Sequence, residues 1–330
     1  MTSPPIVLRP ATGPARARSR GWAVRLPADE IYRQLLTALA VSVFAVLVLI
    51  VYETGRGAMP SIRAFGWRFL VSTDWDPVVE RFGALPYLYG TLVTSTLAMA
   101  LAIPPCVGAA IYLAELASRR VGGALTFVIE LLASIPSIVY GIWGLFVLAP
   151  FLRTTIEPFL IARLGFLPLF RGFPFGIGML NAGLVLAIMV SPTIVSLSRE
   201  ILLSTPRGLR EAALALGATP SEALGVTLEA ARPGILGAVI LALGRALGET
   251  MAVTMVIGNT NRISASLLAP GSTMASVIAN EFTEATGKLY LSALFEIALV
   301  LFAITLVLNA AARLLVRWAT GGRGNGHGGA

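Results

Sequence analysis

The sequence EAALALG, from Glu211 to Gly217, lies in a polar loop between two long apolar stretches. Four further apolar stretches lie elsewhere in the chain, and each of the six can cross a hydrocarbon core, which needs about 20 apolar residues per helix. The chain is 56% hydrophobic and 13% charged, whereas a soluble domain contains about 25% charged residues. We therefore predict an all-α integral membrane protein with six transmembrane helices. The six stretches are Gln34–Tyr52, Tyr87–Ala114, Leu131–Leu152, Gly172–Ser198, Pro233–Ile257 and Leu289–Ala312.

Basic residues are distributed unevenly between the two sides of the predicted helices. With the N-terminus inside, the cytoplasmic segments hold fifteen of the 25 basic residues, the external segments hold nine, and Arg245 lies within the fifth stretch. Loops rich in Lys and Arg tend to stay on the cytoplasmic side of the membrane. We therefore predict that both termini are cytoplasmic. This topology accounts for the net charge of +8 without a nucleic-acid partner.

By composition the chain divides into an Arg-rich cytoplasmic tail over 1–33, a transmembrane domain over 34–318 and a flexible Gly-rich cytoplasmic tail over 319–330. The single cysteine, Cys106, excludes a multi-cysteine metal site. The one Gly-Lys pair, at Gly287, is followed by leucine instead of the Ser or Thr that a phosphate-binding loop requires. We expect no metal, no cofactor and no catalytic residue in this chain.

The cytoplasmic loop over 199–232 is predicted to form a hairpin of two short helices. Thr205 is the expected N-cap of the first helix, and Gly217 stands at its expected C-terminal position. Thr219 and Glu222 have the spacing of a capping box for the second helix. The second helix is expected to end where Pro233 opens the fifth membrane helix.

Four arginines in this loop are balanced by four glutamates, so it lacks the positive field of a DNA-reading helix-turn-helix. A neutral, partly apolar hairpin between two membrane helices is suited to fit the groove of a partner protein and to transmit movement. From the pattern alone, a lid that only covers the helix ends remains the alternative.

Arg245 and Glu249 lie near the middle of the fifth predicted helix. Each costs about 2.5–3.5 kcal/mol at the centre of a bilayer on insertion scales, so both are expected to face protein or water. Their spacing of four predicts one helix face. A polar lining of a substrate path is favoured, and a structural ion pair is the alternative. For an oxyanion substrate, Arg245 would donate hydrogen bonds, while Glu249 would position the arginine and restore neutrality between passages.

The hairpin sequence resembles the coupling-helix signature of ABC importer membrane subunits. The signature is Glu-Ala-Ala followed, after three residues, by Gly. The resemblance implies that this segment seats on a cytoplasmic ATPase. The family pattern continues with Ile, any residue, Leu and Pro, whereas this chain has Thr227–Ala230 at those positions. The positions that match are Glu211, Ala212, Ala213 and Gly217.

Two longer blocks resemble phosphate-specific ABC importer permeases of the PstC type. One reads GRALGETMAVT over Gly244–Thr254 and is followed by Ile-Gly-Asn at Ile257. The other reads ELLASIPSIVYGIWGLFVLAP over Glu130–Pro150. The resemblance extends from about Tyr87 to Arg317. Within the second block, Pro136 removes a backbone hydrogen bond and predicts a kink or break.

The resemblance implies a type I ABC importer in the bacterial plasma membrane that translocates inorganic phosphate by alternating access. This chain would be one permease half, beside a PstA-type second permease, a PstB-type ATPase dimer and a PstS-type phosphate-binding protein. ATP hydrolysis would reside on the partner ATPase, and the membrane lipid would surround the helices. The resemblance also implies that Arg245 and Glu249 are the charged pair needed for transport. The alternatives are an ion-coupled secondary transporter and a membrane sensor or scaffold for phosphate signalling.

Overall fold

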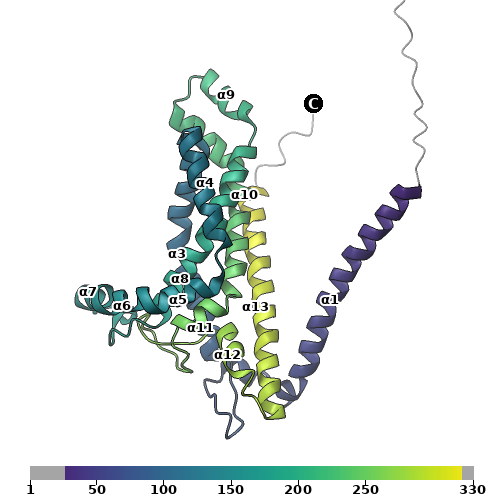
Figure 1. The fold of residues 1–330 in the computed structure, drawn as a ribbon, viewed down its shortest axis with the longest axis vertical. Helices are drawn as coiled ribbons and strands as arrows, with labels where there is room; N and C mark the ends of the chain where they lie inside the picture. The colour runs from purple at the N-terminus through teal and green to yellow at the C-terminus, as the bar shows by residue number, and fades with distance from the viewer. Residues whose placement is uncertain (1–26, 322–330) are drawn as a thin grey trace, which may run out of the picture. The chain divides into compact units, whose positions relative to one another are not determined.

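The computed structural model describes residues 27–321, and the chain divides into two compact units between Ile50 and Val51. Most of the two predicted tails, 1–33 and 319–330, lies outside the described residues, and the described part of each tail is helical. Six described segments are long and apolar enough to cross a membrane, which confirms the predicted number and the all-α class (Figure 1). These segments are Glu30–Phe65, Leu85–Leu116, Ser137–Leu164, Met179–Ser204, Pro220–Leu247 and Lys288–Leu314.

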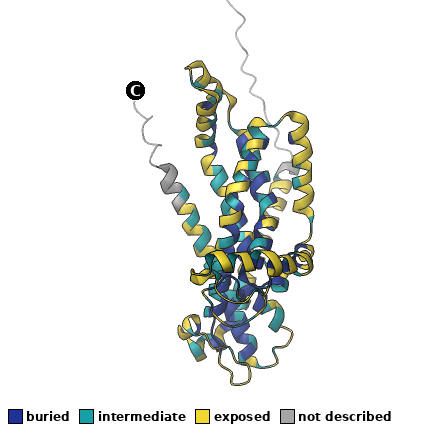
Figure 2. Cartoon of the chain, turned by 90° about the vertical axis from the view of Figure 1, so that its left-hand side faces the viewer, coloured by how far each residue is buried: buried dark blue, intermediate teal, exposed yellow. Residues whose placement is uncertain are grey.

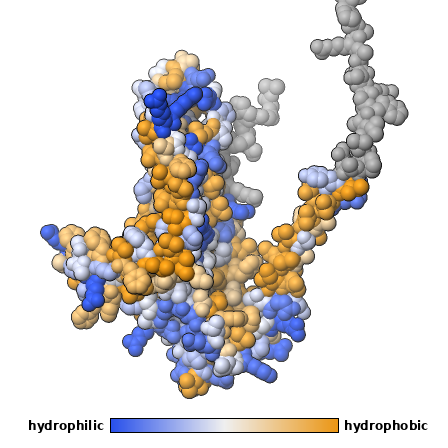
Figure 3. All heavy atoms as spheres, in the orientation of Figure 1, coloured by the Kyte–Doolittle hydropathy of each residue, from blue (hydrophilic) through white to orange (hydrophobic). Residues whose placement is uncertain are grey.

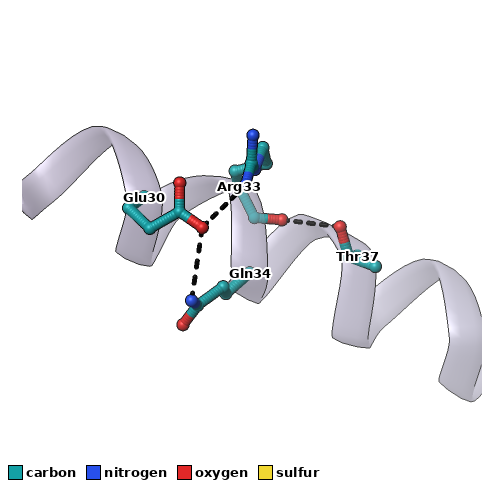
Figure 4. Close-up of polar contacts among 4 residues, drawn as sticks. All are labelled: Glu30, Arg33, Gln34 and Thr37. Carbon is teal, nitrogen blue, oxygen red and sulfur yellow. Dashed lines mark hydrogen bonds and ion pairs between the residues drawn. The ribbon is translucent and has the colours of Figure 1, made fainter. Parts of the chain in front are cut away.

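The first unit contains the start of helix α1 (Pro27–Phe65). Glu30 accepts hydrogen bonds from Arg33 Nη2 at 2.8 Å and from Gln34 Nε2 at 3.4 Å (Figure 4). The Thr37 hydroxyl donates to the carbonyl of Arg33 at 2.8 Å. Past this polar turn, apolar side chains are exposed all around the helix, as a helix surrounded by lipid or by other membrane helices requires. They include Leu36, Val43, Phe44 and Ile50.

The core of the second unit is the contact between α3 (Leu85–Ile111) and α8 (Met179–Ser204). Small residues of α3, among them Ala98 and Ala102, are buried against Val185 and neighbouring residues of α8. A Cβ on Gly183 would lie 2.6 Å from the side chain of Leu97, so any larger residue would force Leu97 to shift. Without a hydrophobic driving force between helices in lipid, such close packing is the main attraction between them.

The third predicted span is broken at Pro136, as the sequence predicted. Helix α4 (Arg119–Ser134) ends before the extended Ile135 and Pro136, and a new helical segment begins at Ser137. The hydroxyl groups of Ser134 and Tyr140 donate to the carbonyls of Leu131 and Leu132, each at 2.8 Å. The predicted start at Leu131 is wrong, because residues 131–134 belong to α4. The segment consists of α5 (Ser137–Trp143), η2 (Gly144–Leu148), α6 (Ala149–Phe151), η3 (Leu152–Ile156) and α7 (Glu157–Leu164).

The fourth span begins at Met179 and not at the predicted Gly172. Gly172 and Gly176 have φ of +131° and +72°, which a right-handed helix excludes. A short turn, η4 (Pro168–Phe170), precedes this segment. Glu157 accepts a hydrogen bond from the Gly176 amide at 2.9 Å, and Asn181 Nδ2 donates to the Gly176 carbonyl at 2.8 Å. The buried loop backbone is therefore paired by side chains.

The hairpin between the fourth and fifth spans consists of α9 (Arg207–Ala215) and the first turns of α10 (Pro220–Leu247). The capping box of Thr219 and Glu222 is present as predicted. The prediction of a separate second short helix is wrong, because α10 continues through Pro233. Proline is tolerated inside membrane helices where the backbone groups that it frees find other partners. The N-cap of α9 is Pro206, whereas the Thr205 hydroxyl donates to the carbonyl of Ile201.

The end of the bundle opposite α9 carries α2 (Arg68–Val71), α11 (Met251–Val256), α12 (Met274–Glu281) and the start of α13 (Lys288–Gly321). Hydrophilic residues gather at the α9 end and at this α12 end, with hydrophobic residues between them (Figure 3). An aromatic cluster lies at the α12 end, where the Trp75 ring meets those of Phe82 and Tyr87 edge to face. Glu281 Oε2 accepts from Trp75 Nε1 at 2.6 Å and from the Tyr290 hydroxyl at 2.7 Å.

Glu281→Ala is expected to lower the thermal unfolding midpoint of the purified protein by a few degrees. The substitution leaves the partly buried donors of Trp75 and Tyr290 unpaired, which costs about 1–3 kcal/mol. A thermal melt in detergent measures the effect, with Glu284→Ala as the control because the Glu284 side chain is exposed. Equal midpoints for the two variants would show that Glu281 does not hold this end together.

Candidate functional site

A cavity of about 1030 Å³ lies between α8, α10 and α13. Its walls are mainly apolar, and no acidic residue lines it. Four polar side chains project from three different helices: Thr193 from α8, Arg245 from α10, and Asn309 and Arg313 from α13. The cavity therefore offers hydrogen-bond donors and positive charge without a compensating negative charge.

Arg245 occupies the last turn of α10, and its side chain is exposed in this chain. Its Nη1 donates to the Thr193 hydroxyl at 3.4 Å, which is longer than a typical hydrogen bond of about 2.7–3.2 Å. No carboxylate among the described residues forms an ion pair with it. The ion pairs of the described part of the chain are Glu30–Arg33, Glu53–Arg56 and Glu115–Arg210. Most donors of the guanidinium are thus free to bind an anion.

Glu249 does not share a helix face with Arg245, which differs from the expectation. Helix α10 ends at Leu247, and Glu249 lies in the short segment before α11. There the half-buried carboxylate accepts a hydrogen bond from the Ala252 amide at 3.2 Å, and so satisfies a free donor in the first turn of α11. Glu249 is also absent from the cavity wall. The sequence signal for the break was Gly248, which is the C-cap of α10.

Three cavity residues were missed by the sequence analysis. Thr193 follows Pro192 inside an apolar stretch and has no pattern that distinguishes it. Asn309 is an amide within the apolar sixth stretch, and its spacing of four from Arg313 was a detectable signal. Arg313 was counted only among the basic residues that set the topology.

The spacing of Ala213 and Gly217 in the hairpin has a physical cause. The Gly217 amide donates to the carbonyl of Leu214 at 3.0 Å, and the Ala218 amide donates to the carbonyl of Ala213 at 3.1 Å. These two bonds form a Schellman motif, which requires a left-handed residue directly after the helix. Gly217 supplies it with φ of +89°. The glycine therefore ends α9 and turns the chain toward α10.

The coupling hairpin, which we define as residues 207–231, is largely exposed (Figure 2). Glu211 and Ala212 are exposed on α9, whereas Ala213 is half-buried. Leu216, at the turn, is 90% exposed. An apolar tip beside a carboxylate is suited to fit a groove on a partner.

One ion pair connects the coupling hairpin to the helix bundle. Arg210 Nη1 contacts Glu115 Oε2, and Glu115 lies in the π-helical turn η1 (Tyr112–Leu116) that continues α3. The Glu115 side chain is only 12% exposed and that of Arg210 is 40% exposed. A partly buried pair of this kind is screened less by salt than a surface pair. It therefore holds α9 against the end of α3.

The chain is similar over most of its length to curated permease proteins. It is 46% identical to the phosphate transport system permease protein PstC of Mesorhizobium japonicum, over 92% of this chain and 95% of that protein. It is 44% identical to the protein of the same name from Haemophilus influenzae, over 87% of this chain and 93% of that protein. A relative of this name in Methanocaldococcus jannaschii, described as probable, is 38% identical over 85% of this chain.

The fold is also similar to solved structures of ABC transporters. A crystal structure of a bacterial alginate ABC transporter, in complex with an alginate pentasaccharide-bound periplasmic protein, matches with a TM-score of 0.60 and 16% identity. The match covers 90% of this chain and 98% of that chain, and at this identity it shows the fold alone. Residues 107–321 match the family described as the binding-protein-dependent transport system inner membrane component. The chain therefore belongs to this family of multi-pass membrane proteins and, within it, to the PstC type of permease.

Proposed function

We propose that this chain is the permease subunit through which inorganic phosphate enters the cytoplasm, in an importer driven by a separate ATPase. The observation that carries the proposal is Arg245 in a cavity without acidic residues, unpaired by any carboxylate among the described side chains. An arginine keeps its charge in a membrane environment, so such a cavity attracts a small oxyanion. The names of the relatives in Mesorhizobium japonicum and Haemophilus influenzae favour phosphate among oxyanions.

Arg245 acts in this proposal by replacing part of the hydration shell of the anion. The guanidinium presents five N–H donors in a plane, two of which fit two phosphate oxygens. Thr193 keeps the side chain over the cavity through a long hydrogen bond that the anion can displace. A single arginine binds phosphate weakly enough to release it, as transport requires, whereas a closed cage of donors would retain it.

We assign Glu249 to the substrate path in a different way from Arg245. Its carboxylate caps the first turn of α11, and Gly248 between the two helices lets the backbone pivot. When the Ala252 hydrogen bond opens, the carboxylate becomes free to approach Arg245, four residues earlier in the chain, and to neutralise it after release. Glu249 then belongs to the state without phosphate, in line with alternating access between two conformations.

The coupling hairpin is proposed to seat on the ATPase. Its exposed Glu211, Ala212 and Leu216 form the contact surface, while Ala213 and Gly217 maintain the Schellman turn that presents them. The lid alternative is less favoured, since a lid would cover apolar surface and Leu216 instead points its own apolar surface outward. The ion pair of Glu115 and Arg210 passes movement of α9 to α3.

The complete importer would contain a PstA-type second permease, a PstB-type ATPase dimer and a PstS-type phosphate-binding protein. The second permease would cover the exposed side of the cavity, and the binding protein would deliver phosphate at the α12 end. We place the protein in the bacterial plasma membrane with both termini in the cytoplasm. An even number of spans and the arginines near α9, such as Arg119 and Arg207, support this orientation. The domain extends over 34–318, and the two tails are cytoplasmic in this proposal.

Uptake of labelled phosphate at low external phosphate tests the proposed function. Cells that lack this chain and every redundant phosphate transporter are compared with and without its restoration, with labelled sulfate as the control. Uptake that returns for phosphate only, and stops when the partner ATPase is inactivated, supports the importer. Uptake that persists without the ATPase indicates an ion-coupled secondary transporter. A restored phosphate-dependent transcriptional response without uptake indicates a sensor.

Arg245→Ala is expected to reduce phosphate uptake by roughly 10- to 150-fold, which corresponds to the loss of a charged hydrogen bond worth about 1.5–3 kcal/mol. Arg245→Lys retains the charge without the planar fork and is expected to keep part of the rate. Arg232→Ala is the matched control, because Arg232 is an exposed residue of the same helix outside the cavity. Equal rates for Arg245→Ala and Arg232→Ala would remove Arg245 from the path.

Reversing either charge of the Glu115–Arg210 pair is expected to reduce transport per ATP hydrolysed. Glu115→Arg or Arg210→Glu places like charges together and loosens α9 from α3. The double exchange restores opposite charges and is expected to recover part of the coupling. Uptake and ATP hydrolysis are measured on the same reconstituted complex. Arg56→Glu, which disrupts an exposed pair, is the control. Failure of the double exchange to improve on both single variants would refute a pairwise role.

The orientation is tested by labelling single cysteines with a membrane-impermeant maleimide. Cys106 is the only native cysteine and is replaced by alanine first. A cysteine at Val79, which is 58% exposed near the α12 end, is expected to react in intact cells. A cysteine at Leu216 is expected to react only after the cells are opened. The reverse pattern would invert the proposed topology.

A further inference from the structure

The cavity that contains Arg245 has a second guanidinium, that of Arg313, which the proposed function does not use. Both arginines line the same cavity of about 1030 Å³, and its lining contains no aspartate or glutamate. None of the ion pairs among the described residues involves either of them. Arginine does not lose its proton in proteins, so the two charges cannot be removed by titration. An anion in the cavity reduces their mutual repulsion.

The two arginines lie at different depths along the antiparallel helices α10 and α13. A Cβ added to Gly244 would lie 3.5 Å from Asn309 Nδ2, so Arg245 stands nearly level with Asn309. Arg313 follows Asn309 by four residues, which is about 6 Å along the helix axis toward the α9 end. A spacing of four also places Asn309 and Arg313 on one face of α13. The donors of Arg245 and Asn309 thus lie at one depth of the cavity, and that of Arg313 lies one turn nearer the α9 end.

We propose that Arg313 and Asn309 form a second oxyanion-binding position in this cavity, which receives phosphate from Arg245 before it leaves at the α9 end. The inference rests on the proposed function, because it concerns the route of the same substrate. Two weak positions one turn apart let an anion advance without a deep energy well, which favours release over retention. The amide of Asn309, which is level with Arg245 and one turn from Arg313, can donate to the anion in either position.

The phosphate group of an anionic lipid has the same chemistry as inorganic phosphate, and an arginine near the end of a membrane helix often reaches the lipid surface. Two observations favour the translocated anion. Arg313 lines the cavity rather than standing apart from it, and Asn309 lies beside it on the same wall. A lipid headgroup would need no amide donor one turn deeper in the membrane. The test below separates the two sources.

The experiment measures inhibition of uptake by inorganic phosphate on the α9 side of the membrane. The full complex, with its second permease, ATPase and binding protein, is reconstituted in vesicles of pure phosphatidylcholine and in vesicles that also contain phosphatidylglycerol. Phosphate loaded on the α9 side occupies the second position and slows transport. Arg313→Gln is expected to raise the half-inhibiting phosphate concentration roughly tenfold or more in both vesicle types, as the loss of a charged hydrogen bond predicts. Arg313→Lys is expected to recover part of the inhibition.

Three results would overturn the proposal. They are a wild-type complex that phosphate on the α9 side does not inhibit, an Arg313→Gln complex inhibited like the wild type, and an effect of Arg313→Gln confined to the vesicles with phosphatidylglycerol. Arg232→Gln is the matched control, since this exposed arginine does not line the cavity. Co-purification of all subunits shows that each variant assembles. If the Arg313→Gln complex does not assemble, inhibition by phosphate is measured on the Arg313→Lys complex instead. Phosphate uptake by the wild type tests the proposed function separately.

Discussion

Backbone polar groups inside the bundle must be paired wherever a helix is interrupted, and the structure depends on how this is done. An unpaired group in hydrocarbon costs several kcal/mol, because no water is available to bond it. At the Pro136 break, the hydroxyl of Tyr140 bonds a carbonyl of the preceding helix. Before α8, the buried Glu157 and Asn181 bond the backbone of Gly176. Between α10 and α11, Glu249 bonds the amide of Ala252. Each interruption is held by side chains from within the protein.

The same constraint separates the two charges of the fifth span. Glu249 satisfies an amide at the break and is therefore held away from Arg245, which faces a cavity instead. An isolated arginine is tolerable because the cavity admits water or an anion, whereas direct contact with lipid is costly. In this conformation the Arg245 guanidinium forms no ion pair among the described residues, whereas the Glu249 carboxylate accepts a hydrogen bond from the Ala252 amide.

Features that depend on local chemistry were predictable from the sequence. The capping box of Thr219 and Glu222, the left-handed Gly217 and the break at Pro136 all follow from residue type and spacing over a few positions. Errors arose where the surroundings decide between two local outcomes. Pro233 begins a helix in one context and lies inside one in another, and here α10 continues through it.

The cavity was beyond sequence reasoning for a related reason. Its wall combines Thr193, Arg245 and Asn309 from three helices, and no spacing along the chain indicates that these helices meet. Gly244 lies against Asn309 in the structure, but nothing in the sequence around Gly244 indicates this contact between α10 and α13. The sequence identified the arginine because a charge in an apolar stretch is conspicuous, but its uncharged neighbours resemble ordinary packing residues.

The continuity of α10 gives a mechanical link between the hairpin and the cavity. Its 28 residues, from the capping box at Thr219 to the turn after Arg245, extend about 42 Å as one helix. A force on the hairpin therefore acts on the same rigid element that carries Arg245, without an intervening loop. A separate second short helix, as first expected, would have absorbed such movement at its junction. The wrong prediction at Pro233 thus concerns the feature that most directly joins the hairpin to the cavity, and the first break in the helix beyond the hairpin falls at Gly248, after the arginine.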